Sequence, residues 1–268
     1  MEMTKTFFAY LVSRSWRATL HLFGFVGGSL SLLLISIKSL FQRPFHFQLF
    51  VEQCYTLGIR SASLVFITAL STGFVMALQF GYGLERFGGK LYVPKVVGMS
   101  IMRELGPVLT CLMLAGRVGS GIAAEIGSMN VTQQIDAIRA LGTDPIKRIV
   151  IPRILSMVLM APLLTVFADL VGITGGLLIS LTELNINADF FIYESITSLK
   201  LTDFTLGISK TFLFGLLISV TGCYYGLNTK GGTQGVGKAT NHAVVTSSIL
   251  IVIFDFILTK LFWILERH

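Results

Sequence analysis

Residues 100–153 read SIMRELGPVLTCLMLAGRVGSGIAAEIGSMNVTQQIDAIRALGTDPIKRIVIPR. The stretch passes from a charged segment through a long apolar one into a short polar segment, and then returns to apolar sequence. Apolar runs of this length are typical of membrane-spanning helices, and they are too long for strands. The stretch therefore predicts an all-α integral membrane protein whose polar segment joins two spans at one membrane face.

The composition agrees with a membrane protein. Apolar residues make up 53% of the chain and charged residues 13%, and the mean hydropathy is +0.76, more than a soluble domain buries. The net charge of +7 lies between apolar runs, where bases attract lipid headgroups and set orientation, so we expect no nucleic acid partner. Three cysteines are scattered without metal-ligand spacing, so we expect neither a disulfide nor a metal site.

The apolar pattern predicts one domain over residues 1–268 with five spanning helices, at residues 61–82, 93–123, 149–181, 206–227 and 243–265. An interfacial helix and an elbow fall within residues 5–40. The segment Leu20 to Ile37 either spans or re-enters; the elbow keeps both basic flanks on one side and is favoured. Basic connections predict a cytoplasmic N-terminus and a C-terminus on the opposite side.

Several charges fall inside the predicted spans, where they are functional candidates by default. Arg103 and Glu104 precede Pro107, which removes a backbone donor and suits a cavity wall; the alternative is that both reach the outer headgroups. Arg117 is deeper, and we expect it to pair with Asp169 or Glu125 as a structural clamp. For Asp255 we expect an interhelical hydrogen bond.

The polar segment predicts a short helix over residues 130–141. Ser128 or Asn130 caps its start, Gly142 ends it, and Thr143 or Asp144 caps the next helix. One stripe is apolar and the other is polar with mixed charge; the stripes consist of Val131, Ile135 and Ile138, and of Gln133, Asp136 and Arg139. Mixed charge favours a protein partner over a lipid surface.

The segment GTQGVGK from Gly232 to Lys238 nearly matches a phosphate-binding loop, but Ala239 occupies the position of the required hydroxyl. It also joins two predicted membrane helices. We therefore expect no ATP site, no directly bound cofactor and no enzymatic activity in this chain.

The segments RELGP, AAEIGSM, IDAIRALGTDP and GVGKAT resemble those of the MlaE-type permeases, the membrane subunits of ABC transporters that move lipids for MCE proteins. The resemblance implies a homodimer in the bacterial inner membrane, with an elbow helix and five spans per chain. It also implies partner ABC ATPase subunits that use ATP, a periplasmic MCE protein hexamer, a STAS-domain protein in some members, and a periplasmic C-terminus.

Carried over to this sequence, the resemblance implies two sets of site residues. The helix at 130–141 matches the coupling helix that docks on the ATPase; the residues assigned to coupling are Glu125, Met129, Gln133, Asp136 and Arg139. The residues assigned to lipid binding are Arg103, Glu104, Leu105, Met76, Leu84 and Phe87.

The implied function is movement of phospholipid or a related lipid between the inner membrane and the MCE protein. One alternative is a membrane scaffold that anchors the ATPase and the periplasmic carrier without forming the lipid path. A second is an ion-coupled transporter that uses Asp169 or Asp255; the lack of repeat symmetry in the sequence counts against it.

Overall fold

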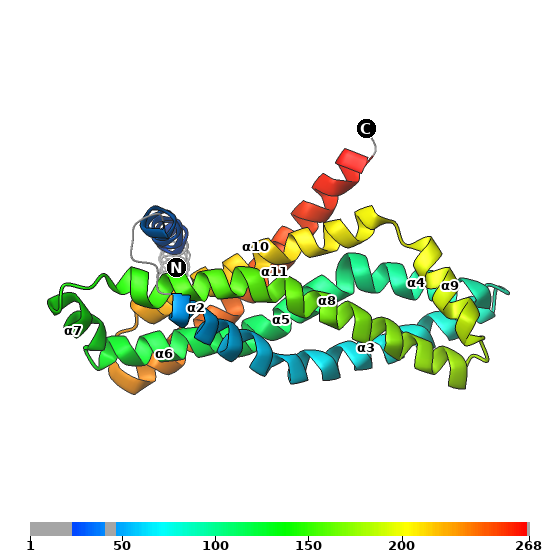
Figure 1. Ribbon diagram of the computed structural model, residues 1–268, viewed down its shortest axis with the longest axis horizontal. Coiled ribbons are helices and arrows are strands. Elements are labelled where there is room, and N and C mark those ends of the chain that lie inside the picture. Colours follow the sequence, from blue (N-terminus) through cyan, green and yellow to red (C-terminus); the bar gives the residue numbers. More distant parts are fainter. Residues whose placement is uncertain (1–22, 41–46, 267–268) are drawn as a thin grey trace, which may run out of the picture. The chain divides into compact units, whose positions relative to one another are not determined.

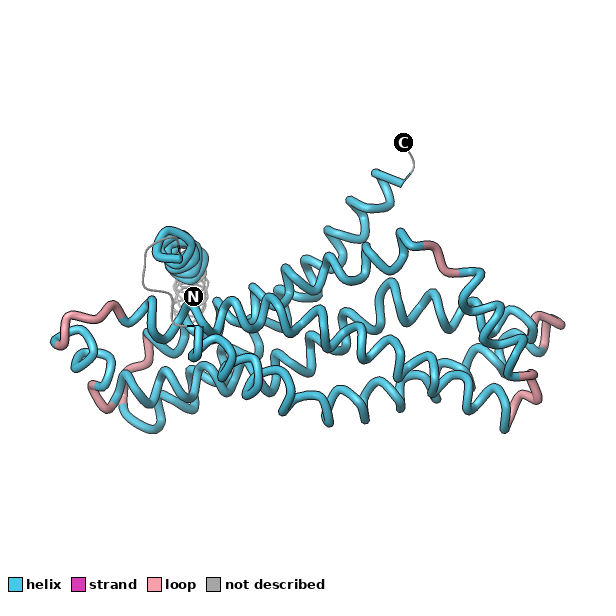
Figure 2. The backbone as a smooth tube through the Cα atoms, viewed as in Figure 1, coloured by secondary structure: helices cyan, strands magenta, loops and turns pink. Residues whose placement is uncertain are grey.

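The computed structural model describes residues 23–40 and 47–266. These residues form helices joined by short loops, and no strand occurs among them (Figures 1 and 2). The all-α membrane fold expected from the sequence is confirmed. The chain divides into two units, Met1–Phe45 and His46–His268. The interfacial helix expected near residues 5–19 lies outside the described residues.

The first unit contains the helix Phe23–Leu40. Its 18 residues are long and apolar enough to cross a membrane. Leu30, Leu34 and Ile35 are exposed, as side chains in contact with lipid would be. The helix covers most of the segment Leu20 to Ile37, which was expected either to cross the membrane or to re-enter it. Its unbroken length favours crossing. The basic residues that flank it in the sequence favour an elbow.

The second unit holds the remaining helices. In chain order they are α2 (Phe47–Gln53), η1 (Cys54–Gly58), η2 (Ile59–Ser61), α3 (Ala62–Glu85), η3 (Lys90–Tyr92), α4 (Val93–Ser100), η4 (Ile101–Leu105), α5 (Gly106–Leu114), η5 (Ala115–Gly119), α6 (Ser120–Val131), α7 (Gln134–Ala140), η6 (Ile146–Val150), α8 (Ile151–Thr182), α9 (Ala188–Ser198), α10 (Leu201–Leu227) and α11 (Gly232–Glu266).

Each of the five expected spans is present as a helical segment with wider bounds. The helical stretches long and apolar enough to cross a membrane are Phe47–Glu85, Lys90–Val131, Ile146–Thr182, Leu201–Leu227 and Gly232–Leu265. Hydropathy marks only the apolar part of a helix, whereas backbone hydrogen bonding continues into polar flanks. The segment from Gly232 to Lys238 accordingly forms the first turns of α11, not a loop around a phosphate.

Helix α8 lies between α3 and α10 and packs along both (Figure 1). Small residues permit this packing. A Cβ atom at Gly73 of α3 would overlap the backbone carbonyl of Gly172 in α8, so the two backbones approach closely, as is common where lipid provides no hydrophobic drive for association. The loops of the second unit lie at its two ends (Figure 2), called below the α7 end and the α9 end.

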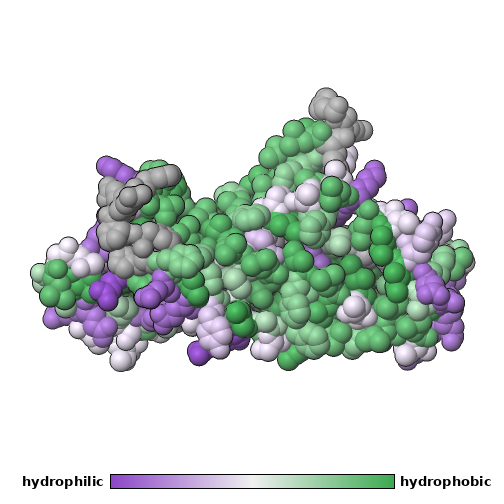
Figure 3. Space-filling view, viewed as in Figure 1, coloured by the Kyte–Doolittle hydropathy of each residue, from purple (hydrophilic) through white to green (hydrophobic). Residues whose placement is uncertain are grey.

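On the face drawn in Figure 3, hydrophobic residues cover the middle of the second unit. Hydrophilic residues gather near α7 at one end and near the turn after α3 at the other. The apolar middle is also evident in single side chains: Ile67 of α3 and Leu163 and Leu170 of α8 are more than half exposed. An apolar band between polar ends is the surface that a bilayer requires.

The short polar helix differs from its expected bounds. Helix α6 continues through Asn130 to Val131, so the start expected at residue 130 is wrong. The chain breaks instead at Gln133, whose φ of 60° is left-handed, and α7 follows. The reason is that the Asn130 side-chain amide does not cap α7: it donates to the carbonyls of Leu227 and Thr229, at 3.0 Å each.

The other end of α7 agrees with the sequence. Gly142 has a φ of 75°. Its N–H donates to the Arg139 carbonyl at 2.9 Å, and the N–H of Thr143 donates to the Ile138 carbonyl at 3.2 Å. This pair of bonds is a Schellman motif, which needs a residue that tolerates left-handed backbone. Asp144 then caps the next helix by accepting from the Ile146 N–H at 2.9 Å.

Candidate functional site

A lysine lies at the centre of the helical bundle. Lys210 is the tenth residue of α10, about 14 Å along the helix axis from its start. It is only 2% exposed and is among the largest fully buried side chains of the described residues. A charge at this depth requires several partners, and the structure provides them from two segments, η4 and α11.

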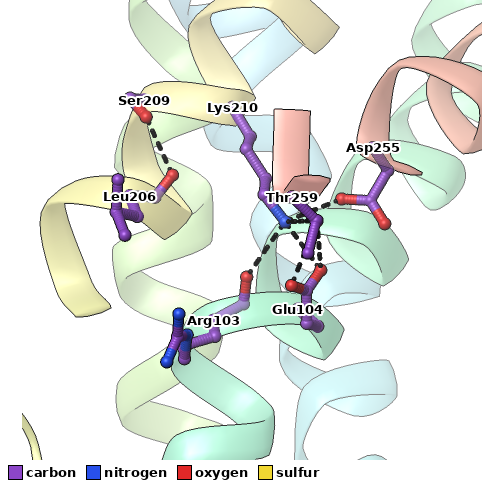
Figure 4. A network of polar contacts seen from close by, with 7 residues as sticks. All are labelled: Arg103, Glu104, Leu206, Ser209, Lys210, Asp255 and Thr259. Atoms are coloured by element: carbon purple, nitrogen blue, oxygen red, sulfur yellow. Dashed lines mark hydrogen bonds and ion pairs between the residues drawn. The ribbon is translucent and has the colours of Figure 1, made fainter. Parts of the chain in front are cut away.

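The Lys210 ammonium has four oxygen neighbours (Figure 4). Its Nζ lies 2.6 Å from Glu104 Oε2, 2.7 Å from Thr259 Oγ1 and 3.0 Å from Asp255 Oδ1. Thr259 in turn donates to Glu104 Oε1 at 3.2 Å. Glu104, Lys210, Asp255 and Thr259, here called the Lys210 cluster, therefore tie η4, α10 and α11 together.

The fourth neighbour is the backbone carbonyl of Arg103. Pro107 has no N–H, so the carbonyl of Arg103, four residues earlier, lacks its usual helical donor. Lys210 Nζ lies 3.4 Å from that oxygen. The residues before the proline, Ile101–Leu105, form a π-helical turn, a local widening that often marks functional sites.

Two glycines let the backbones meet at this point. A Cβ atom at Gly207 of α10 would overlap the carbonyl oxygen of Met102. A Cβ atom at Gly106 would overlap the carboxylate of Asp169, which is 2% exposed. Asp169 Oδ1 has no hydrogen-bond partner among the described residues. The π-helical turn of η4 and the start of α5 are thus packed directly against α8 and α10.

A second ion pair lies on the other side of η4. The Arg103 guanidinium points away from Lys210 (Figure 4), and its Nη1 is 3.3 Å from Asp203 Oδ1. Asp203 Oδ2 accepts from the Lys200 N–H at 3.1 Å, which caps α10. The buried carboxylate of Asp203 therefore fixes both the start of α10 and the position of Arg103.

The predicted lipid-binding residues do not form one group. Arg103 and Glu104 lie side by side in η4, and Leu105 lines a small cavity of about 20 Å³ with Gly106. Met76 and Leu84 pack instead against an apolar cluster around Val97 and Phe191. Phe87 lies in the turn after α3 and is 87% exposed.

The predicted partners of the deeper charges are partly wrong. Arg117 is exposed and forms no ion pair with Asp169 or Glu125 among the described residues. Glu125 instead pairs with Arg153, with 2.6 Å between Oε1 and Nη2, because α8 places a buried arginine nearer to it. The interhelical bond expected for Asp255 is confirmed, and its donor is Lys210.

The residues assigned to coupling lie near the α7 end. Glu125 and Met129 line a cavity beside α2, and Gln133 is the left-handed residue before α7. Asp136 and Arg139 are exposed and pair with each other at 3.1 Å. Ile135 is buried, as expected of the apolar stripe, but Val131 belongs to α6 and Gln133 precedes α7, so the expected stripes do not lie on one helix.

Sequence reasoning missed Lys210 and the pairing of Asp203 with Arg103. A signal for Lys210 was present, because it is the one charged residue in the predicted span 206–227 and such residues are candidates by default. Its partners come from residues about 106 and 45 positions away in the chain, which no local pattern reveals.

The described residues contain no group of three or more histidine, cysteine, aspartate or glutamate side chains that could hold a metal ion. The Lys210 cluster has one cation, two carboxylates and one hydroxyl, linked from three helices. Such an arrangement suits binding of a polar group or the relative movement of helices.

The chain is similar to a group of membrane proteins. A family model described as Permease MlaE matches residues 50–261. A probable ABC transporter permease protein of Rickettsia typhi is 41% identical over 85% of this chain and 88% of its own length. One of Synechocystis is 41% identical over 79% and 80%. The chloroplastic protein TRIGALACTOSYLDIACYLGLYCEROL 1 of Arabidopsis thaliana is 34% identical over 81% of this chain and 62% of its length.

Proposed function

Because the chain belongs to the MlaE permease family, we propose that it is the membrane subunit of an ABC transporter that moves a phospholipid or related lipid between the bacterial inner membrane and a periplasmic MCE protein. The name of the Arabidopsis relative includes that of a lipid, which supports a lipid substrate. ATP hydrolysis then belongs to partner subunits.

The Lys210 cluster is the observation that carries the proposal. Lys210 and Asp203 have side chains only 2% and 3% exposed, whereas those of their partners Glu104 and Arg103 are 39% and 32% exposed. The buried Lys210 and Asp203 therefore hold Glu104 and Arg103 in place, while part of each of the latter side chains stays accessible to a ligand. The Glu104 carboxylate can bind the amine of a lipid headgroup and the Arg103 guanidinium can bind its phosphate, from two different faces of η4.

We place the α7 end in the cytoplasm, since its connections carry Lys147, Arg148, Lys230 and Lys238 and basic connections stay inside. The α9 end then faces the periplasm, where the MCE protein would dock. The ATPase and a STAS-domain protein would dock on the cytoplasmic side, the ATPase on α7. Movement of α7 would reach the Lys210 cluster through the continuous helical segment Lys90–Val131.

A second copy of the chain would form a homodimer with this one through α11. Only 6% of the residues in the apolar stretch of α11 are buried, and the last turns of the helix extend away from the bundle (Figure 1). Exposed residues there include Val252, Phe256 and Leu261. In a cysteine-free background, Phe256→Cys should form a disulfide-linked dimer in membranes and Ile67→Cys on α3 should not; an equal yield from both would remove the support for this interface.

The lipid role is tested by Arg103→Gln with Glu104→Gln. Loss of charge-assisted bonds to a headgroup lowers affinity by about tenfold or more. ATP-dependent transfer of a fluorescent phospholipid should fall accordingly in proteoliposomes that contain the ATPase and MCE partners. The matched control is Lys95→Gln, an exposed residue of α4. Unchanged transfer in the double variant would reject the headgroup role.

The scaffold alternative makes a different prediction for the same complex. A photoreactive phospholipid should label residues near Arg103 if the chain forms the lipid path, and labelling should change with ATP. A scaffold would leave these residues unlabelled while the complex still transfers lipid. That outcome would replace the proposed lipid path with the scaffold.

The coupling role is tested by exchanging two charges, Asp136→Arg with Arg139→Asp. The exchange retains the pair within α7 and so conserves the helix, but it reverses the pattern that a partner meets. Co-purification of the ATPase should fall by about tenfold, the effect of one or two misplaced charge pairs. Lys238→Gln, exposed on α11, is the control; undiminished co-purification of the exchange variant would show that the ATPase docks elsewhere.

A further inference from the structure

A second polar site lies at the α7 end, apart from the Lys210 cluster. It is a cavity of about 210 Å³ between α2, the α6–α7 segment and the start of α8. A water molecule occupies about 30 Å³ of liquid, so the space holds a group the size of several waters. We call it the α2 cavity, and its polar lining residues are Glu52, Gln53, Glu125, Arg148 and Arg153.

The α2 cavity contains polar atoms without partners. Arg153 is 5% exposed; its Nη1 donates to the Ile149 carbonyl at 2.8 Å and its Nη2 pairs with Glu125, but its buried Nε has no hydrogen-bond partner. The buried Oε1 of Gln53 lacks one as well. Buried polar atoms normally have partners, so a donor and an acceptor remain here for a bound group.

The charges of the α2 cavity are divided between its walls. Arg148 and Arg153 belong to the wall formed by η6 and α8, whereas Glu52 comes from α2 and Glu125 from α6. Arginine binds phosphate oxygens, and carboxylates accept hydrogen bonds from ammonium groups. A ligand with a phosphate near an amine therefore matches this arrangement, whereas a purely anionic group would leave the glutamates facing it.

The position of the α2 cavity favours a lipid as the source of that ligand. Helix α2 begins the helical stretch Phe47–Glu85, which is long and apolar enough to span the membrane. The start of such a stretch lies at headgroup depth. Phe47 and Val51 of α2 are 64% and 49% exposed and offer an apolar surface for acyl chains next to the polar lining.

We propose that the α2 cavity binds the zwitterionic headgroup of a phosphoethanolamine-type glycerophospholipid, its phosphate on Arg148 and Arg153 and its ammonium on Glu52 and Glu125. The bound lipid would join α2 to the α6–α7 segment. The proposal stands apart from the lipid path at Arg103 and Glu104, because it uses other residues at the α7 end and does not require transport.

The test uses the full chain in nanodiscs with a photoreactive amino acid in place of Leu49, a lining residue of α2. Phosphatidylethanolamine should be labelled at this position. Glu52→Gln with Arg148→Gln removes one charge from each side of the ligand, and labelling should fall by about tenfold. Lys147→Gln, next to Arg148 but outside the lining, is the matched control and should label as the wild type does.

Three results would overturn the proposal. They are equal labelling in the double variant, equal labelling of phosphatidylglycerol, which has no amine, and full protection by soluble phosphoethanolamine at the concentration of the lipid. Lys210→Met serves as a separate arm: it should leave labelling at residue 49 unchanged, so that failure of the lipid path and failure of this site are distinguishable.

Discussion

Replacement of Lys210 by methionine removes the central ammonium and retains an unbranched side chain of similar length. Glu104 and Asp255 then remain without their shared cation. Neutral polar pairs between membrane helices average about 0.6 kcal/mol, but removal of one partner from a buried ion pair costs about 3–5 kcal/mol because a charge is left uncompensated. Glu104 and Asp255 side chains are 39% and 21% exposed, so we expect the lower end, about 3 kcal/mol.

The loss is measurable as a lower unfolding temperature of the detergent-solubilised protein. For a chain of this size, 1 kcal/mol corresponds to about 2–4 °C, so the apparent Tm should fall by about 6–12 °C. Lys260→Met, an exposed residue of α11, is the control for loss of a lysine. Size-exclusion chromatography after heating gives the fraction that remains folded at each temperature.

A second variant decides whether uncompensated charge is the cause. Lys210→Met with Asp255→Asn leaves only one acid and should recover about half of the lost stability. An apparent Tm of Lys210→Met equal to that of the wild type would refute the reasoning. So would a double variant less stable than the single one, because the second change would then remove a favourable interaction.

Two further changes test how the helices are held around the site. Gly207→Ala places a Cβ atom on the Met102 carbonyl and should lower stability by about 1–3 kcal/mol in the same unfolding assay, whereas Gly116→Ala, which meets no atom within 4 Å, should not lower it; equal effects would contradict the close approach. Asn130→Ala removes two hydrogen bonds to α10 and the loop after it and should increase amide hydrogen exchange in α7 at a cost of about 1–2 kcal/mol; unchanged exchange would show that other contacts hold α7.

Much of the fold was predictable because it depends on local sequence. Apolar runs located the five spans of the second unit, and Gly142 with Asp144 located the end of α7 and the start of the next helix. The bounds of α7 were less accessible. Asn130 is a good cap by type, but its amide bonds the end of α10 nearly a hundred residues away, and this tertiary contact outweighs the local preference.

The site was predictable only in part for the same reason. Arg103, Glu104 and Asp255 were identified as charges in apolar surroundings, and each does lie in an ion pair. Which charges meet depends on helix rotation and approach, which Gly207 and Pro107 help to set. Arg117 had the same signal in sequence but lies on an exposed face, so depth along a span does not determine the direction of a side chain.

The mismatch between three N–H groups on the Lys210 ammonium and four oxygens around it has a mechanical consequence. Because there is one oxygen more than there are N–H groups, a small rotation of α11 that displaces one acceptor still leaves three oxygens for the three N–H groups. Pulling α11 away would break several bonds at once. The junction therefore resembles a pivot: it resists separation of the helices, and it allows them to turn.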